Sequence, residues 1–143
     1  MNLRLITYGC GKEFDPAKFK PIRNRTFVKP DGGLWASPVD AEYGWREWCK
    51  AEDFGDLSHS FTFEFEGNVF VIDDVHDAAS MPWIEMIEGT NLKCPDFEAM
   101  ANLGYDAIYL TAKGQTETRF GPPSLYGWDC ESVLIMNPQG VKS

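Results

Sequence analysis

The stretch from Ser60 to Glu66 has the sequence SFTFEFE, in which three phenylalanines alternate with polar side chains. A period of two places the phenylalanines on one face of a β-strand and the polar side chains on the other. After Gly67-Asn68, a pair of residues typical of tight turns, the run Val69–Ile72 is apolar throughout. This pattern predicts a β-hairpin in which 60–66 pairs with 69–72, and the rest of a sheet is expected to build on it.

Further strands and helices are expected on both sides of this hairpin, from the same kind of periodicity and from capping and stop signals. The expected strands are 3–8, 34–36, 107–110 and 132–136, and the expected helices are 16–19 (a single turn), 41–51 (with Asp40 as its N-cap), 83–87 and 95–103. Residues 111–129 are polar and rich in glycine and proline, which predicts a long loop, and residues 137–143 are expected to form a tail.

The order of these elements predicts an α+β fold in one domain over residues 1–143, because this length and an apolar content of 43% suit a single core. No apolar run is long enough to cross a membrane, and the start turns polar too soon for a signal peptide. A soluble, cytoplasmic protein without a membrane partner is therefore expected. The four cysteines include no CxxC pair and only two histidines accompany them, so lone thiols and no metal site are expected.

The net charge of −9 is unevenly distributed along the chain. Residues 1–29 carry seven basic and two acidic side chains, a local charge of +5, which leaves −14 for residues 30–143. An anionic ligand is therefore expected to meet the N-terminal segment, although a solvated basic stretch would have the same composition. Nucleic-acid binding is disfavoured, because the acidic remainder of the chain would repel the phosphate backbone.

Several common catalytic motifs are missing from the sequence, among them GxxxxGK[ST], GxSxG and HExxH. Gly9-Cys10-Gly11 lacks the third glycine of a dinucleotide-binding fingerprint, so a Rossmann-type site is not expected. His76 lies among carboxylates in DDVHD, residues 73–77. It is either a base or metal ligand or, as the simpler interpretation, part of a solvated acidic turn.

Three segments resemble ADP-ribosyltransferase domains and occur in the same order along the chain. They are TYG (7–9) followed by FDPAKF (14–19), GGLWAS (32–37) followed by DAEYGW (40–45), and LGYDAI (103–108) followed by ESVLIMNP (131–138). The first is similar to the family's opening strand, which ends in His-Gly or Arg-Gly. The second is similar to its G-[LF]-[YW]-x-[ST] strand and the helix that brings a second aromatic, and the third to the close of phage-associated and toxin-type members.

This resemblance implies an ADP-ribosyltransferase-like split β-sheet core with short helices. It also implies mono-ADP-ribosylation of a protein or small-molecule acceptor with NAD as substrate, or NAD hydrolysis when no acceptor is present, and it implies no metal. Glu131 matches the family's catalytic glutamate, whose carboxylate stabilises positive charge on the ribose as the bond to nicotinamide breaks. Asp129 matches an earlier acidic position that goes with arginine acceptors, and on an extended backbone Asp129 and Glu131 would share one face.

The second segment implies the residues that hold the nicotinamide ring. Trp35, together with Tyr43 or Trp45, would pin this flat and positively charged ring between aromatic faces. Ser37 stands at the Ser or Thr position of the strand motif, where a contact to NAD is expected.

The N-terminal segment implies the remaining contacts to NAD. Tyr8 and Gly9 lie where the family's backbone grips the nicotinamide amide, and a glycine permits close approach of a ligand. Arg23 and Arg25 would hold the pyrophosphate as forked donors. Tyr8 stands where the family has His or Arg, and a domain that keeps an NAD-shaped cleft without transfer activity would have much the same sequence.

A second interpretation assigns these residues to structure alone. It places Trp35, Trp45 and Trp48 in an ordinary core, Glu131 at the surface and Ser37 in a turn. The chain is then a small acidic protein that binds a host protein or a nucleotide without catalysis. The charge of −14 outside the N-terminal segment favours this alternative.

Overall fold

The computed structural model describes residues 1–9, 11–25, 29–53, 57–85, 89, 93–120, 124–125 and 127–142. The strands are β1 (Asn2–Tyr8), β2 (Leu34–Pro38), β3 (Ser60–Glu66), β4 (Val69–Ile72), β5 (Trp83–Glu85), β6 (Lys93–Pro95), β7 (Ala107–Leu110), β8 (Ser132–Ile135) and β9 (Val141–Lys142). The helices are α1 (Trp45–Glu52), α2 (Val75–Ala79), α3 (Phe97–Asn102) and α4 (Ala112–Glu117), with 3₁₀ turns η1 (Pro16–Lys18) and η2 (Pro138–Gly140).

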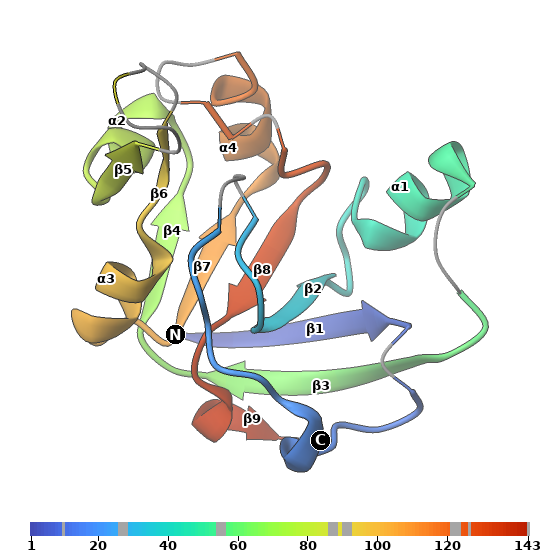
Figure 1. The fold of residues 1–143 in the computed structure, drawn as a ribbon. Coiled ribbons are helices and arrows are strands. Elements are labelled where there is room, and N and C mark those ends of the chain that lie inside the picture. The colour runs from blue at the N-terminus through green and yellow to red at the C-terminus, as the bar shows by residue number, and fades with distance from the viewer. Residues whose placement is uncertain are drawn as a thin grey trace.

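The described strands form a seven-stranded sheet in the order β4-β7-β8-β2-β1-β3-β9 and a separate pair, β5-β6. Neighbouring strands are antiparallel except β4 and β7, which are parallel. Figure 1 shows that β1 and β3 cross the direction of β4, β7 and β8 at a steep angle. The α+β class predicted from the sequence is confirmed, with a mostly antiparallel sheet and short helices.

The predicted hairpin between β3 and β4 is wrong, although both strands exist. β3 pairs with β1 along its whole length, from Asn2 opposite Glu66 to Tyr8 opposite Ser60, whereas β4 pairs in parallel with β7. The turn residues bond elsewhere, since the N–H of Gly67 donates to the carbonyl of Met1 at 3.1 Å. The chain therefore passes at residues 67–68 from one part of the sheet to another.

Helix α1 begins at Trp45, four residues later than predicted, so Asp40 is not its N-cap. Gly44 precedes the helix, and its N–H donates to the carboxylate of Glu47 at 3.1 Å. The N–H of Trp45 donates to the hydroxyl of Ser37 at 3.0 Å, which replaces an N-cap by a side chain from β2. α3 lies within the predicted 95–103.

Four further predictions of local structure are corrected. Residues 83–85 form strand β5 rather than a helix, and residues 86–87 lie outside the described residues. The expected loop 111–129 begins with helix α4, and the expected tail contains η2 and β9, which extends the sheet beside β3. His76 is exposed on helix α2 rather than in an irregular turn.

The buried side chains form two clusters on the two faces of the sheet. The helix-side core consists of Ile22, Ile72, Ala78, Met81, Phe97, Met100, Ile108, Leu110, Leu125, Trp128, Leu134 and Met136. The sheet-side core consists of Leu5, Leu34, Ala36, Phe61, Phe63, Phe65, Ala107, Val133 and Ile135. Residues of β2 alternate between them, because Leu34 and Ala36 belong to the second cluster while Trp35 packs against the first.

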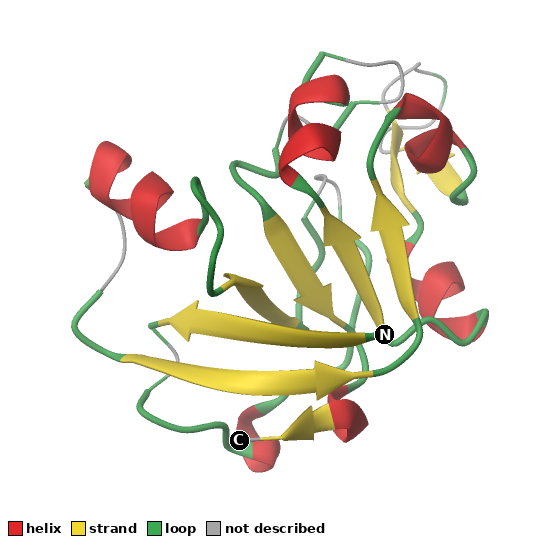
Figure 2. Ribbon diagram, turned by 180° about the vertical axis from the view of Figure 1, so that it is seen from behind, coloured by secondary structure: helices red, strands yellow, loops and turns green. Residues whose placement is uncertain are grey.

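Helices α2 and α3 lie beside the β4 edge of the sheet, and α1 lies near the ends of β1 and β2, as seen from opposite directions in Figure 1 and Figure 2. No helix within the described ranges has the length and apolar character needed to cross a membrane. Cys49, Cys94 and Cys130 are free, buried thiols, as predicted. Cys10 lies outside the described residues.

Candidate functional site

Ser37 is the point at which separate segments of the chain meet. Its hydroxyl donates to the carbonyl oxygen of Glu131 at 2.8 Å and accepts the N–H of Trp45 at 3.0 Å, and the residue is only 2% exposed. A Cβ at Gly44 would lie 2.9 Å from Ser37, so glycine is needed for this approach. The N–H of Glu131 donates in turn to the carbonyl of Tyr43 at 3.1 Å. Ser37 therefore ties β2, the start of α1 and the segment before β8 together.

The carboxylate of Glu131 is held by Tyr109, a residue of β7 that the sequence analysis did not single out. The Tyr109 hydroxyl donates to Glu131 Oε2 at 2.5 Å. Burial, and then the neighbouring Glu131, raise the pKa of Tyr109 above its ordinary range, so the hydroxyl keeps its proton and remains a donor. Tyr109 packs against the sheet-side core, and Glu131 is therefore a partly buried carboxylate on that face. The signal in the sequence was a polar-tipped residue within the apolar strand AIYL.

Four tryptophans form a contiguous cluster, Trp35, Trp45, Trp48 and Trp128. Trp35 packs edge-to-face on Trp45 and on Trp128, with ring centroids 5.9 and 4.8 Å apart, and Trp45 packs in the same way on Trp48 at 5.6 Å. Edge-to-face contacts of this kind stabilise a core beyond the area buried. Trp35 and Trp45 are thus in direct edge-to-face contact, whereas Tyr43 is 47% exposed, and the predicted holding of a ring between two aromatic faces stays a prediction.

Lys29 places a positive charge on this tryptophan cluster. Its Nζ lies 4.8 Å from the ring centroid of Trp45, and 5.8 and 5.9 Å from those of Trp48 and Trp35. The same ammonium forms an ion pair with Asp129 Oδ2 at 2.5 Å. Lys29 was not predicted as a site residue, because its sequence context, before Pro30, indicates only a turn.

Asp129 and Glu131 consequently have separate partners. Asp129 contacts Lys29 beside the tryptophan cluster, whereas Glu131 contacts Tyr109 toward the sheet-side core. Their predicted common face is not formed, because the chain bends at residues 130–131 and β8 begins only at Ser132. Cys130 between them is fully buried, and burial raises the pKa of its thiol to about 12.

Tyr8 and Gly9 end strand β1 next to helix α1. Burial raises the pKa of Tyr8, and the opposing charges of Arg46 and Glu47 lie near its hydroxyl. Gly9 has a φ of +80°, which favours glycine, and its N–H donates to the carbonyl of His59 at 3.0 Å.

Arg23 and Arg25 are gathered around Asp31. The backbones of Arg23 and Asp31 exchange two hydrogen bonds of 2.9 Å, and Arg25 Nη1 forms an ion pair with the Asp31 carboxylate at 2.9 Å. Both side chains of this ion pair are largely exposed, with fractions of 48% and 65%. Arg25 thus balances a carboxylate of its own turn, and the predicted role of both arginines at a pyrophosphate stays a prediction.

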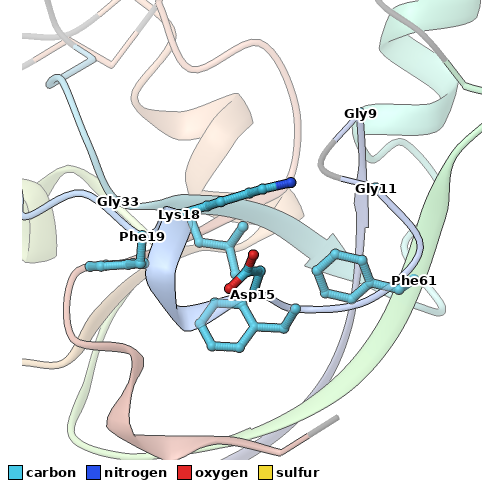
Figure 3. A pocket seen from close by; sticks show the side chains of 9 residues that line it. Gly9, Gly11, Asp15, Lys18, Phe19, Gly33 and Phe61 are labelled. Carbon is cyan, nitrogen blue, oxygen red and sulfur yellow. The ribbon is translucent and has the colours of Figure 1, made fainter.

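A cavity of about 350 Å³ opens where β1 and β2 diverge (Figure 3). Its lining residues are Gly9, Gly11, Phe14, Asp15, Lys18, Phe19, Gly33, Leu34 and Phe61. Figure 3 shows the Lys18 side chain extended above the Asp15 carboxylate, which also accepts the N–H of Ala17 at 3.0 Å. The volume is at the lower end of the range for small-molecule sites. Gly9 is the predicted site residue that reaches it.

The predicted site residues thus fall into three groups. Hydrogen bonds join the first group, which consists of Ser37, Tyr43, Trp45 and Glu131. The tryptophan cluster and Lys29 connect the second group, Trp35 and Asp129, to the first. The third group lies apart from these contacts, with Tyr8 and Gly9 at the end of β1 and Arg23 and Arg25 around Asp31. Within the described ranges, no three His, Cys, Asp or Glu side chains come together to hold a metal ion. Comparison with protein families, curated proteins and solved structures found no match for this chain.

Proposed function

We propose that this chain transfers ADP-ribose from NAD to an acceptor, or hydrolyses NAD when no acceptor is present, with Glu131 as the carboxylate beside the ribose. The observation that carries the proposal is the junction at Ser37. The segments GGLWAS and ESVLIMNP, which resemble ADP-ribosyltransferases as separate motifs, meet there through the 2.8 Å hydrogen bond to Glu131. The start of α1, the third element that the resemblance implies, is bound to the same hydroxyl.

The contact with Tyr109 supports the role given to Glu131. A hydrogen bond of 2.5 Å fixes one oxygen of the carboxylate. A negative charge whose orientation is already fixed stabilises a developing positive charge without reorganising during the reaction. Glu131 as a residue is partly exposed, so its surroundings are open to solvent on one side.

The tryptophan cluster supports NAD as the ligand, because it already holds a cation. The nicotinamide ring of NAD is flat and positively charged, and aromatic faces attract such rings. The indole Nε1 of Trp45 is buried and has no hydrogen-bond partner among the described residues, so a ligand's oxygen can satisfy it. Lys29 has to leave the cluster before a ring enters, and Asp129 is the carboxylate that would then face the ring.

The test is turnover of NAD labelled on its adenylate phosphate by the purified chain. We expect either a labelled acceptor or free ADP-ribose, and we expect Glu131→Gln to lower the rate by roughly 100-fold or more because the charge beside the ribose is lost. Glu117→Gln, an exposed residue at the end of α4, is the matched control and should keep the wild-type rate. Circular dichroism establishes that each variant is folded.

Two results would count against this assignment. If Asp129→Asn abolishes turnover while Glu131→Gln retains it, the catalytic carboxylate is Asp129. If the wild type releases no nicotinamide with any acceptor tried, the activity itself is wrong.

A second candidate function is binding without catalysis. The observation in its favour is that Lys29 and Asp129 already fill the aromatic site with an internal ion pair. Tight binding of a protein partner in calorimetry, combined with no NAD turnover, would establish this second function in place of the first.

A further inference from the structure

The surroundings of the Lys29 ammonium have the composition of a binding site for an organic cation. Three indole rings have their centroids within 5.9 Å of Nζ, and a carboxylate lies against it. Aromatic faces attract cations through the ring quadrupole, and a neighbouring carboxylate supplies the opposite charge. Sites built in this way recognise quaternary ammonium groups, which carry charge but no hydrogen-bond donor.

We propose that Trp35, Trp45, Trp48 and Asp129 form a binding site for a quaternary ammonium or pyridinium cation, and that Lys29 occupies this site when no ligand is bound. We refer to these four residues as the cation site. The side chains of Lys29 and Asp129 are 30% and 25% exposed, so the site communicates with solvent. Rotation of the flexible lysine stem can empty it while the rings stay packed.

The chemistry of the two cations favours their exchange. A primary ammonium is strongly hydrated, so Lys29 recovers solvation when it moves out into water. A quaternary ammonium or pyridinium group is weakly hydrated and gains more from the aromatic faces. Lys29 therefore acts as an internal competitor that sets how strongly an outside cation binds.

The proposal of a cation site depends only on these contacts. It depends on the proposed function in one respect, which is the identification of the nicotinamide ring of NAD as the natural ligand. A quaternary ammonium ion can fill the site whether or not the chain turns NAD over. Binding of a simple cation and turnover of NAD are therefore separate measurements, and either one can fail while the other succeeds.

The experiment titrates tetramethylammonium chloride into the folded chain and follows the indole N–H signals by NMR. We expect Lys29→Met, which keeps the apolar stem and removes the charge, to bind tetramethylammonium at least tenfold more tightly than the wild type. Lys29→Arg keeps a cation in place and should bind no better than the wild type. The uncharged analogue tert-butanol and sodium chloride at equal ionic strength should leave the indole signals of Lys29→Met unchanged.

A measurement on the wild type covers the case in which Lys29→Met does not fold. The Lys29 Nζ lies over indole rings, so the NMR signals of the adjacent ε-methylene protons are expected to be shifted upfield and to move to ordinary values when tetramethylammonium displaces the side chain. The proposal is overturned if these signals do not respond to tetramethylammonium. It is also overturned if folded Lys29→Met binds no more tightly than the wild type, or if tert-butanol binds equally well.

Discussion

The hydroxyl of Tyr109 and the carboxylate of Glu131 form a hydrogen bond at a position where both residues are partly buried. Their hydrogen bond of 2.5 Å is shorter than a neutral one, as expected when the acceptor is a carboxylate. Asp40 and Asp73 also lie near enough to act on the Tyr109 hydroxyl, and their negative charges help to keep its pKa high. The hydroxyl is consequently a permanent donor, and it is what separates Glu131 from an ordinary surface carboxylate.

Tyr109→Phe is expected to lower the free energy of unfolding by about 1–2 kcal/mol, because the carboxylate loses a charge-assisted hydrogen bond. Urea denaturation measures the change. Tyr105→Phe is the matched control: its ring packs on Phe70 at 5.3 Å, and it should change stability by less than about 0.5 kcal/mol. Equal losses in the two variants would show that the Tyr109 hydroxyl contributes nothing specific.

Helix α4 shows how a short helix can be fixed by contacts that its own sequence does not reveal. Its six residues, AKGQTE, include a glycine in the middle and no apolar stripe, so the segment resembles a loop. In the fold, Thr111 caps it by accepting the N–H of Gly114 at 3.0 Å. Gly114 then rests against the backbone of β4, where a Cβ would lie 1.9 Å from the carbonyl oxygen of Ile72.

Gly114→Ala is expected to lower the free energy of unfolding by about 2–3 kcal/mol, although alanine favours a helix over glycine by about 1 kcal/mol. The added methyl group would meet the Ile72 carbonyl, and a backbone group cannot move aside as a side chain can. Gln115→Ala in the same helix introduces no such clash and serves as the control. Thermal unfolding of the three proteins decides the matter, and a stabilised Gly114→Ala would contradict the close packing of α4 on β4.

The two cores of the molecule share one sheet, and several ionisable groups are buried with them. Cys130 is fully buried, and its pKa is raised to about 12, while burial also raises the pKa values of Cys49 and Cys94. A free thiol ordinarily ionises near pH 8.5, so the unfolded chain loses these protons before the folded chain does. The whole molecule is therefore expected to lose stability on the alkaline side.

The sign follows from the raised pKa. Below about pH 8.5 both states hold the Cys130 proton and the stability is complete, whereas between about pH 8.5 and 12 only the folded state holds it. We expect Cys130 to contribute a fall of about 1.4 kcal/mol per pH unit in this interval, and Cys130→Ala to remove that part of the slope. Val133→Ala, equally buried, should lower stability without changing the slope. Denaturation curves from pH 8 to 11 test this, and parallel pH profiles for wild type and Cys130→Ala would refute it.

The elements that could be predicted are those with a local signal. β1, β3, β7 and β8 were located from apolar periodicity, and η1 from Asp15 and Pro16. The contacts that join Ser37, Trp45 and Glu131 come from three separate segments of the chain, and their role in an NAD site stays a prediction. Helix α4 was not predicted, because the roles of its cap Thr111 and of Gly114 depend on how the helix packs on β4 in the folded structure.

The positions of these strands could be predicted from the sequence, since alternation of apolar and polar side chains is a property of neighbouring residues. Strand partners could not be predicted in this way: β3 and β4 are adjacent in sequence yet pair with different strands, because pairing depends on which strands meet as the whole sheet assembles. A bend at residues 130–131 gives Asp129 and Glu131 different partners, and tertiary packing brings Lys29 to Asp129 from a distant part of the chain. Periodicity indicated which side chains are buried, whereas long-range packing brought together the charges of Lys29 and Asp129, which are 100 residues apart in the sequence.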